Sequence, residues 1–460
     1  MVAALLLRGC AFAQDKPTTQ SEPKVVTVPA TLDHNRVVID VEVPSANGST
    51  QRVRAWINPG TPELLISPHV AHLLGLGGLC GGQTCDTAAP PGIVIGGMEI
   101  SFRGVKAAKI LVRSRHGETE QVRLAPGLDA DIAIPSTVLR NYDVLIDYPG
   151  RKFTIGAPGT IHFQGTSAKV QVNAENGFID IPSRIENKKY DLALDLSGEI
   201  SSLSSDLFNA LAASHADWPR MIGAVGPASS RVFVDGVNSK VMRMERLQFG
   251  PLFLTNVPVA DDDQMHSFRT PGNNGAIGAQ ALLNYRVGID YTHSMVYFDI
   301  GRLANIPDFD VIGLILRPEE DGRYTILGAA DIDGKPSVPT GENGVQAGDE
   351  LIAVNGNPVH GSTLGVVWSL LGGTPGQERR LTIERAGKQF IVTAQVQHFL
   401  AEAPDEPAKK KGSNLHFAAA TGPNTSFSSV ATVVASMLSL ISTVSPCSSI
   451  TTVPSSVVHA

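Results

Sequence analysis

The sequence predicts a mainly β protein in which one β-rich unit occurs twice and a different, smaller domain follows. The first observation is a repeat: residues 139–148 and residues 282–291 share the pattern L-x-N-Y-x-V-x-I-D-Y. The shift along the chain that carries residue 139 to residue 282 is called the repeat offset below. The second observation is the composition, because 45 glycines and 30 prolines among 460 residues are typical of a turn-rich chain. A repeat of this length is too long for a solenoid unit and fits a small domain.

The first unit begins with a predicted β-hairpin over residues 37–57. Apolar residues alternate on both sides of a polar turn at residues 45–49, which is the pattern of two half-buried strands. The second strand delivers Asn58 to a tight turn, and the apolar run 64–66 predicts a return strand. Ser67 followed by a proline predicts a helix that starts there with Ser67 as its N-cap.

The second unit repeats this order of elements. Residues 178–181 and 190–194 predict a hairpin, the turn begins at Asp195, and residues 200–203 predict the return strand. Ser205 is predicted to cap a helix over residues 206–213. Each unit then ends in one copy of the repeated strand. The two units account for residues 25–305, and the repeated Asp147 and Asp290 are predicted to have a structural hydrogen-bonding role.

A separate domain is predicted from residue 309. Its signals are a glycine-punctuated segment at residues 344–356, an apolar helix from Ser362 to Leu371, and a hairpin over residues 381–392. Residues 399–460 form a polar linker and a Ser/Thr-rich tail that we expect to be disordered. The apolar stretch 430–444 is too short to span a membrane, so no integral membrane segment is predicted.

Charge and the N-terminus limit the location and the partners. The formal charge of −7 excludes a general nucleic-acid binder, which needs a basic face. Residues 1–22 are similar to a secretory signal, with an apolar run at 2–7 and a small-x-small motif at 11–13, and they predict export to the periplasm or the extracellular space. No basic residue precedes the apolar run, so an accidental similarity stays the alternative.

The cysteines and histidines predict a loop disulfide and no metal site. Cys80 and Cys85 bracket a flexible loop whose ends can approach within disulfide reach, with free thiols as the alternative. His69 and His72 have the spacing of two helical metal ligands, but no third ligand lies near them in the sequence. We therefore expect no metal and no other cofactor.

Residues 25–305 resemble two tandem retropepsin-like aspartic protease domains, and residues 309–398 resemble a PDZ domain. The resemblance implies two β-barrel lobes, 23–157 and 158–305, that form a bilobal acid-protease-like unit, followed by a PDZ domain at 309–398, as in exported bacterial proteases. It also implies that a glycine-flanked strand braces each catalytic turn. Residues 275–278 fit that strand, whereas residues 131–135 have lost both glycines.

The same resemblance locates the candidate catalytic pair. The family has an Asp-Thr/Ser-Gly turn in each lobe, but this chain has Asn58-Pro59-Gly60 and Asp195-Leu196-Ser197. The family's reaction needs two carboxylates that share a proton, and a carboxamide cannot accept one. Asp195 is thus predicted as the sole surviving carboxylate and Asn58 as its degenerate partner, with side chains about 3 to 5 Å apart. Peptidase activity is expected to be weakened or lost; the alternative is an exported, non-catalytic peptide-binding protein.

The PDZ resemblance implies a second binding site. Such a domain adds a peptide C-terminus as a strand and receives its carboxylate on the backbone N–H groups of a loop. The helix up to Leu371 would form the other wall of this groove. The partners implied are protein C-termini at the PDZ domain and an extended peptide in the interlobe cleft, although the domain is alternatively a packing module. The loop is assigned to Ile312, Gly313, Leu314 and Ile315.

Overall fold

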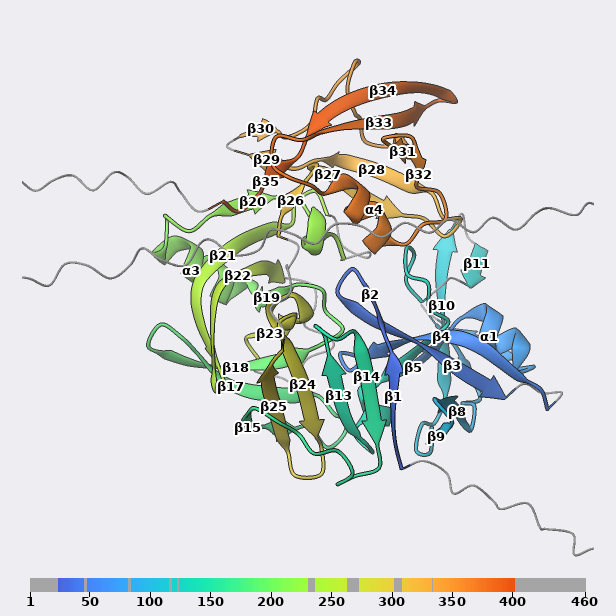
Figure 1. Cartoon of the computed structure of the whole chain (residues 1–460). Helices are drawn as coiled ribbons and strands as arrows, with labels where there is room; N and C mark the ends of the chain where they lie inside the picture. The colour runs from blue at the N-terminus through green and yellow to red at the C-terminus, as the bar shows by residue number, and fades with distance from the viewer. Residues whose placement is uncertain are drawn as a thin grey trace, which may run out of the picture. The chain divides into compact units, whose positions relative to one another are not determined.

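The computed structural model describes a mainly β protein (Figure 1). All described residues lie in one compact unit, 1–404. The predicted signal and nearly all of the predicted linker and tail lie outside the described residues. No helix within the described part of the chain has the length and apolar character to cross a membrane. The described ranges are 24–44, 48–81, 84–115, 118–121, 124–230, 236–262, 273–301, 308–332 and 334–401.

The first sheet has the order β6-β7-β10-β5-β12-β4-β3-β8-β9. Its β3 and β4 form the predicted hairpin, and α1 (Pro68–Leu73) follows β5 as predicted. Ser67 is confirmed as the N-cap because its Oγ accepts the N–H of Val70 at 3.2 Å. The strands are β2 (Thr31–Asp33), β3 (Arg36–Pro44), β4 (Thr50–Asn58), β5 (Leu64–Ile66), β6 (Gly78–Gly81), β7 (Thr84–Thr87), β8 (Gly92–Ile95), β9 (Met98–Ser101), β10 (Ala108–Arg115), β11 (Glu118–Gln121) and β12 (Ile132–Pro135), and α2 (Ser136–Leu139) follows β12.

The second sheet has the order β16-β17-β18-β23-β19-β22-β21-β20-β29-β30. Five of its strands, β22-β19-β23-β18-β17, repeat the order β10-β5-β12-β4-β3 of the first sheet, and the parallel pairs recur in the same places. The strands from residues 171–278 are β16 (Gln171–Val172), β17 (Ile179–Ile185), β18 (Lys188–Asp195), β19 (Ser201–Ser204), β20 (Arg220–Ile222), β21 (Lys240–Phe249), β22 (Leu252–Asp262) and β23 (Gly275–Gly278).

One helix start in this second half differs from the prediction. Helix α3 spans Ser205–Ser214, and its N-cap position is Ser204, which makes no side-chain cap hydrogen bond. Ser205 lies inside the helix and donates its hydroxyl to Asp261 Oδ1 at 2.6 Å. The carboxylate of the neighbouring strand thus competes with the helix end for this hydroxyl, so the prediction of Ser205 as cap was wrong.

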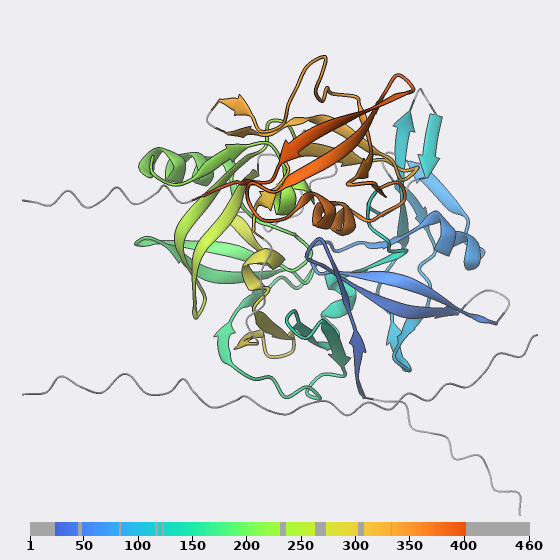
Figure 2. The same cartoon turned by 45° about the horizontal axis from the view of Figure 1, so that its top comes forward.

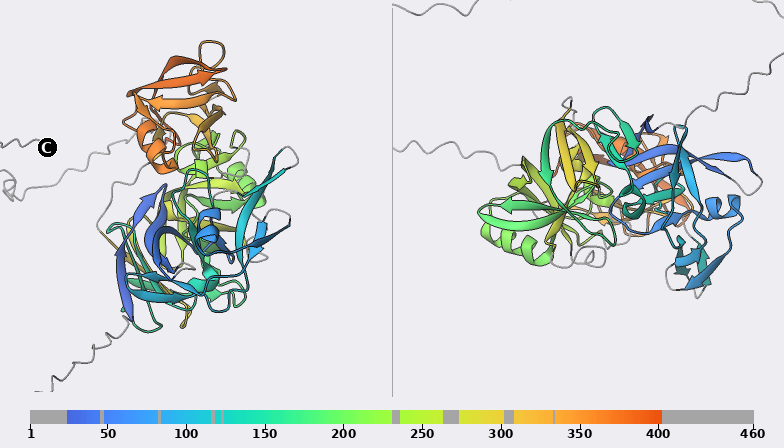
Figure 3. Two further views of the ribbon diagram at one scale, coloured as in Figure 1. Left: turned by 90° about the vertical axis from the view of Figure 1, so that its right-hand side faces the viewer. Right: turned by 90° about the horizontal axis from the view of Figure 1, so that it is seen from below.

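The two copies of the sequence repeat pair with each other in a third sheet, of order β1-β14-β13-β24-β25-β15. Asp143 of β13 faces Asp290 of β24, and Asp147 faces Arg286. Under the repeat offset Asp143 corresponds to Arg286 and Asp147 to Asp290, so the register is unchanged when the copies are exchanged. This sheet lies between the first sheet (blue) and the second (green) in Figure 3. Its strands are β1 (Val25–Pro29), β13 (Asp143–Asp147), β14 (Lys152–Gly156), β15 (Thr166–Lys169), β24 (Tyr285–Asp290) and β25 (Met295–Ile300).

The C-terminal region contains a sheet of order β27-β28-β31-β33-β34, with α4 (Leu364–Leu371) beside it (Figure 2). Thr363, not Ser362 as predicted, is the N-cap of α4, because its Oγ1 accepts the N–H of Val366. The strands are β26 (Asp310–Val311), β27 (Leu314–Pro318), β28 (Tyr324–Ala329), β29 (Asp331–Ile332), β30 (Lys335–Pro336), β31 (Glu350–Val354), β32 (Asn357–Pro358), β33 (Glu378–Arg385), β34 (Lys388–Gln395) and β35 (Gln397–His398).

The C-terminal region pairs with and packs against the second sheet. Strand β29 extends the second sheet, since Asp331 pairs with Ile222 of β20. One hydrophobic cluster contains Met221, Val225 and Val241 together with Phe309 and Ile315. The C-terminal region is therefore packed against the second sheet through both backbone pairing and buried apolar side chains.

Candidate active site

Asn58 and Asp195 lie at equivalent ends of equivalent strands. Asn58 ends β4 and is paired with Pro135 of β12, while Asp195 ends β18 and is paired with Gly278 of β23. Pro135 and Gly278 correspond to each other under the repeat offset. Each turn therefore begins where a strand of the repeated sheet pattern ends.

The two turns are in contact through Gly60. A Cβ added to this glycine would lie 2.4 Å from Oδ1 of Asp195 and 2.3 Å from Oγ of Ser197. A side chain at this position would displace the Ser197 or Asp195 side chain, so glycine permits the backbone of the first turn to approach the carboxylate of the second. The turn that carries Asn58 thus faces the turn that carries Asp195, and the predicted distance between the two side chains remains a prediction.

Three donors from its own turn hold the Asp195 carboxylate. Its Oδ1 accepts the N–H of Ser197 at 3.1 Å, the N–H of Gly198 at 3.0 Å, and the Ser197 hydroxyl at 2.5 Å. Hydrogen bonds of this kind fix the orientation of a carboxylate and stabilise its charge. Ser197 therefore orients Asp195.

Tyr148, the last residue of the first repeat copy, lies in the field of Asp195. Burial, and next to it the negative charge of Asp195, raise the pKa of the Tyr148 hydroxyl. The phenol is consequently neutral, and its oxygen is buried without a hydrogen-bond partner among the described residues. The sequence singled out Tyr148 only as part of the repeat and gave no signal of this neighbourhood.

The first turn carries no carboxylate. Asn58 is only 5% exposed, and its carboxamide has no acidic or basic group that titrates near neutral pH. Pro59 has no backbone N–H to donate, and Leu196 of the other turn is buried and has no hydroxyl. The geometry is that of two facing turns, but only one of them carries a carboxylate.

The segment behind each turn holds it in the same way. Ser136 donates its N–H to the carbonyl of Thr61 at 3.0 Å, and Ala279 donates to the carbonyl of Gly198 at 2.7 Å. The two donors again correspond to each other under the repeat offset. At Gly278 an added Cβ would lie 2.5 Å from the backbone carbonyl of Ile200, which requires a glycine there.

The repeated aspartates have the structural role predicted for them. Asp147 Oδ1 accepts the N–H of Gly150 at 2.8 Å, and Asp290 Oδ1 accepts the N–H of His293 at 2.9 Å. Each carboxylate stabilises the turn that follows its strand, as short polar side chains commonly do.

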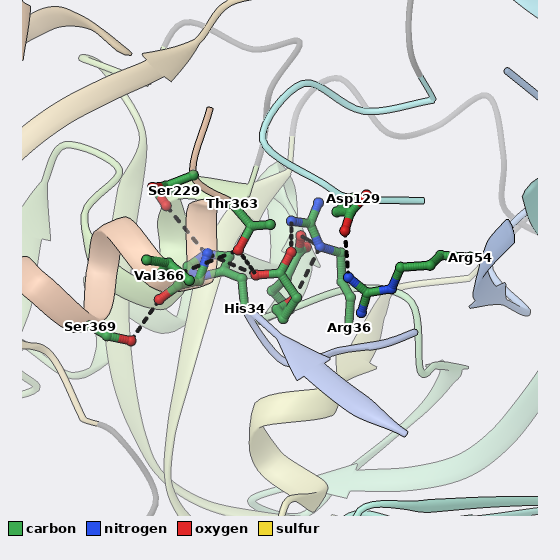
Figure 4. Close-up of polar contacts among 12 residues, drawn as sticks. His34, Arg36, Arg54, Asp129, Ser229, Thr363, Val366 and Ser369 are labelled. Atoms are coloured by element: carbon green, nitrogen blue, oxygen red, sulfur yellow. Dashed lines mark hydrogen bonds and ion pairs between the residues drawn. The ribbon is translucent and has the colours of Figure 1, made fainter. Parts of the chain in front are cut away.

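A buried ion-pair network next to the Asp195 turn was missed by the sequence analysis. Arg36 is 2% exposed, and its Nε lies 3.3 Å from Oε1 of Glu199, the residue directly after Gly198 in the chain. Its Nη2 lies 3.8 Å from Asp33 Oδ2, and Asn35 Nδ2 donates to the Glu199 carbonyl at 3.2 Å. Arg36, which Figure 4 labels, and Asn35 therefore contact the residue that directly follows the second turn.

The β2–β3 turn positions this network. His34 and Asn35 have φ values of 52° and 67°, as the two central residues of a tight hairpin turn require. Burial and the charge of Arg36 lower the pKa of His34 to about 3. Its Nε2 lies 3.2 Å from the Ser229 hydroxyl, as Figure 4 shows. An Asn in a short polar turn between two apolar runs was the available sequence signal for this hairpin.

The predicted carboxylate-binding loop is brought to the C-terminal end of α4. There the N–H of Ile312 donates to the Leu371 carbonyl at 3.0 Å, and the N–H of Leu314 donates to the Ile312 carbonyl at 2.8 Å. Gly313 packs so closely that an added Cβ would lie 2.6 Å from the Phe399 ring. The loop and the predicted wall therefore meet, but two amides that would receive a carboxylate are already bonded within the protein.

The predicted disulfide loop lies at the β6–β7 pair. Cys85 is disulfide-bonded, and Cys80 stands opposite it in the register of β6 and β7. The side chain of Cys80 lies outside the described part of the structure, so the Cys80–Cys85 pairing remains a prediction.

Comparisons with known proteins give remote structural likenesses only. No family model matches the sequence, and no curated protein matches it. An aspartic proteinase from Irpex lacteus is 11% identical with a TM-score of 0.38, covering 61% of this chain and 98% of its own. Basic 7S globulin from soybean is 11% identical with a TM-score of 0.33, covering 60% and 94%.

A third solved structure matches a shorter part of the chain. It is the PDZ domain of a carboxy-terminal protease from Vibrio cholerae, solved with a peptide, and it is 24% identical with a TM-score of 0.17, covering 19% of this chain and 94% of its own. All three TM-scores are below 0.5, so none of these likenesses assigns an activity to the chain.

Proposed function

We propose that this chain is an aspartic-protease-like protein that binds extended peptides at the Asn58 and Asp195 turns and cleaves them weakly or not at all. The observation that carries the proposal is the contact of Gly60 with the Asp195 carboxylate, which gives the two turns the facing arrangement of a dyad. Asn58 then occupies the place of the second carboxylate.

The chemistry of this pair is the reason why we expect little or no cleavage. Peptide hydrolysis by a dyad needs one ionised carboxylate to deprotonate water and one protonated carboxyl to polarise the scissile carbonyl. Asp195 can serve as one partner, but Asn58 can neither share its proton nor return it to the leaving amine. Peptide binding has no such requirement, because backbone and side-chain hydrogen bonds are sufficient to hold an extended chain.

The second candidate function is a slow peptidase. It is favoured by Asp195 itself, whose Oδ1 is held by three donors from its own turn, as a positioned general base requires. In this alternative Asp195 deprotonates the water and Asn58 only orients it by hydrogen bonding.

The domain arrangement is part of the proposal. Two retropepsin-like lobes, 23–157 and 158–305, share the sheet formed by the repeat, and a PDZ domain at 309–398 binds the C-termini of peptides or proteins. The recurrence of the five-strand pattern in the first and second sheets supports the two lobes. We further propose that the protein is exported, as the N-terminal segment predicts.

A repaired dyad tests the proposal. The triple variant Asn58→Asp, Pro59→Thr, Leu196→Thr is compared with the natural chain on fluorescently labelled casein between pH 3 and pH 7. We expect casein binding by both proteins and cleavage by the repaired variant at least about a hundredfold faster. The repaired variant with Asp195→Ala is the matched control, and it should not cleave.

The other outcomes separate the candidates. Cleavage by the natural chain that Asp195→Ala abolishes would establish the slow peptidase. Absence of both binding and cleavage in the natural chain, with no gain on repair, would reject an aspartic-protease-like site altogether.

A further inference from the structure

The N-terminus of α4 is held by a carboxylate from the far end of the chain. Asp33 Oδ1 accepts the Thr363 hydroxyl at 2.9 Å and the N–H of Gly365 at 2.9 Å. The approach is close, since a Cβ on Gly365 would lie 2.3 Å from that oxygen. A carboxylate here satisfies the orphan donors of the first helical turn and complements the helix dipole. Figure 4 labels Thr363 and Val366 at this helix end.

A second segment of the first half holds the same helix end. The carbonyl of Gly127 accepts the N–H of Leu364 at 2.7 Å. Gly127 also lies against the end of β27, since a Cβ on it would be 3.0 Å from Pro318 and 3.2 Å from the Tyr324 hydroxyl. The segment around Gly127 therefore bridges the end of β27 and the start of α4.

Apolar side chains of β27 and α4 are buried in one hydrophobic cluster. At the other end of the helix, Leu371 is bonded to Ile312, so that both ends of α4 are fixed. The apolar side chains that would line a peptide groove, Leu314, Leu316 and Val367, are at most 5% exposed. A chain end can enter only if α4 moves away from β27.

A chain of contacts connects α4 to the Asp195 turn. Asp33, which holds the helix, also forms the ion pair with Arg36, and Arg36 in turn pairs with Glu199. Arg36 is fully buried, and a buried guanidinium needs its counter-charges held in place. Glu199 directly follows Gly198, whose N–H binds Asp195.

We propose that α4 is a latch that links the two binding sites of the chain. When a chain end opens the groove, α4 releases Asp33, the Asp33–Arg36–Glu199 network rearranges, and the Asp195 turn loosens. By reciprocity, a peptide that stabilises the Asp195 turn keeps the groove closed. The identity of the two peptide ligands rests on the function proposed above, but the structural link between α4 and the Asp195 turn does not depend on it.

Hydrogen–deuterium exchange of the full-length chain without ligand tests the link. Asp33→Ala removes the carboxylate that α4 and Arg36 share. We expect the amides of residues 364–371 and those of residues 196–204 both to exchange roughly five- to tenfold faster. Asp40→Ala is the matched control, since Asp40 lies on β3 of the same hairpin and pairs with the exposed Arg52, away from the network, and it should change neither segment.

Two further variants act from opposite ends of the network. Thr363→Ala removes the cap hydroxyl alone and serves if Asp33→Ala does not fold. Glu199→Gln removes the charge at the turn and should accelerate exchange in α4, which is the reciprocal effect. Faster exchange confined to the mutated element, in either direction, would overturn the latch. This readout needs neither peptide binding nor cleavage, so failure of the latch and failure of the proposed function are distinguishable.

Discussion

The Asn58 turn and the Asp195 turn have matching backbones and different chemistry. Both follow a strand of the same sheet pattern, and in both a carbonyl further along the turn accepts an N–H from segments related by the repeat offset. The side chains differ: one turn presents a carboxylate held by three donors, and the other a carboxamide. Strand pairing and backbone hydrogen bonds are therefore sufficient to preserve such a turn, and they place no demand on the acid.

The largest expected difference in stability between the two halves lies in the strands behind the turns. Gly278→Ala places a Cβ 2.5 Å from the Ile200 backbone carbonyl, and this contact is with the backbone and cannot yield cheaply. We expect a loss of about 3 kcal/mol or more in the free energy of unfolding, measured by urea denaturation. Pro135→Ala, the matched change in the first half, should cost less than about 1 kcal/mol. Equal losses of stability at both positions would contradict the view that the strand behind the turn requires glycine in the second half and not in the first.

Contact between the turns is tested at Gly60. Gly60→Ala must displace either the first turn or the side chains of Asp195 and Ser197, because its Cβ would lie within 2.4 Å of both side chains. We expect a loss of roughly 2–3 kcal/mol in stability and weaker casein binding. Gly198→Ala meets Asp195 Oδ2 at 2.9 Å within the same turn and is the milder control. Unchanged binding in Gly60→Ala would show that the peptide does not contact the paired turns.

The sequence predicted what local patterns determine. Alternating apolar residues located the hairpins, and the ends of those hairpins located Asn58 and Asp195. The caps of two helices were placed one residue late or early, because Ser204 and Ser205, or Ser362 and Thr363, are chemically interchangeable as caps. Only the tertiary partners of these hydroxyls decide between them.

The network around Arg36 could not be predicted, for a physical reason. It joins Asn35 to Glu199 across 164 residues and Asp33 to Thr363 across 330 residues. No periodicity or turn signal encodes which distant charges meet, and a single Arg in a strand is as compatible with solvent as with a buried pair. For the same reason, the sequence could not predict that the Ile312 N–H is bonded to the Leu371 carbonyl, since this contact depends on the position of α4.

Acid is expected to destabilise the protein through one buried histidine. The first half carries His34, whose pKa is lowered to about 3 by burial and by Arg36, and which faces Ser229. Because the unfolded chain binds a proton near pH 6.5 and the folded chain does not, stability is complete above pH 6.5 and falls toward pH 3. The loss amounts to about 2 kcal/mol at pH 5. His34→Gln should flatten the urea-denaturation profile between pH 7 and pH 5, whereas an unchanged slope would place the titration elsewhere.

The smallest expected effect separates the two helix starts. Ser67 caps α1 by accepting the N–H of Val70 and donates to Asp131 Oδ1 at 2.7 Å, whereas Ser205 lies inside α3 and only donates to Asp261. Ser67→Ala should therefore cost about 1–2 kcal/mol, and Ser205→Ala about 0.5 kcal/mol, because alanine recovers helix propensity there. The two free energies of unfolding are compared with that of the natural chain. A larger loss for Ser205→Ala would mean that the hydrogen bond from the serine hydroxyl to a carboxylate, and not the cap, stabilises the helix after each turn. The two halves would then be equivalent in this hydroxyl–carboxylate pair as well.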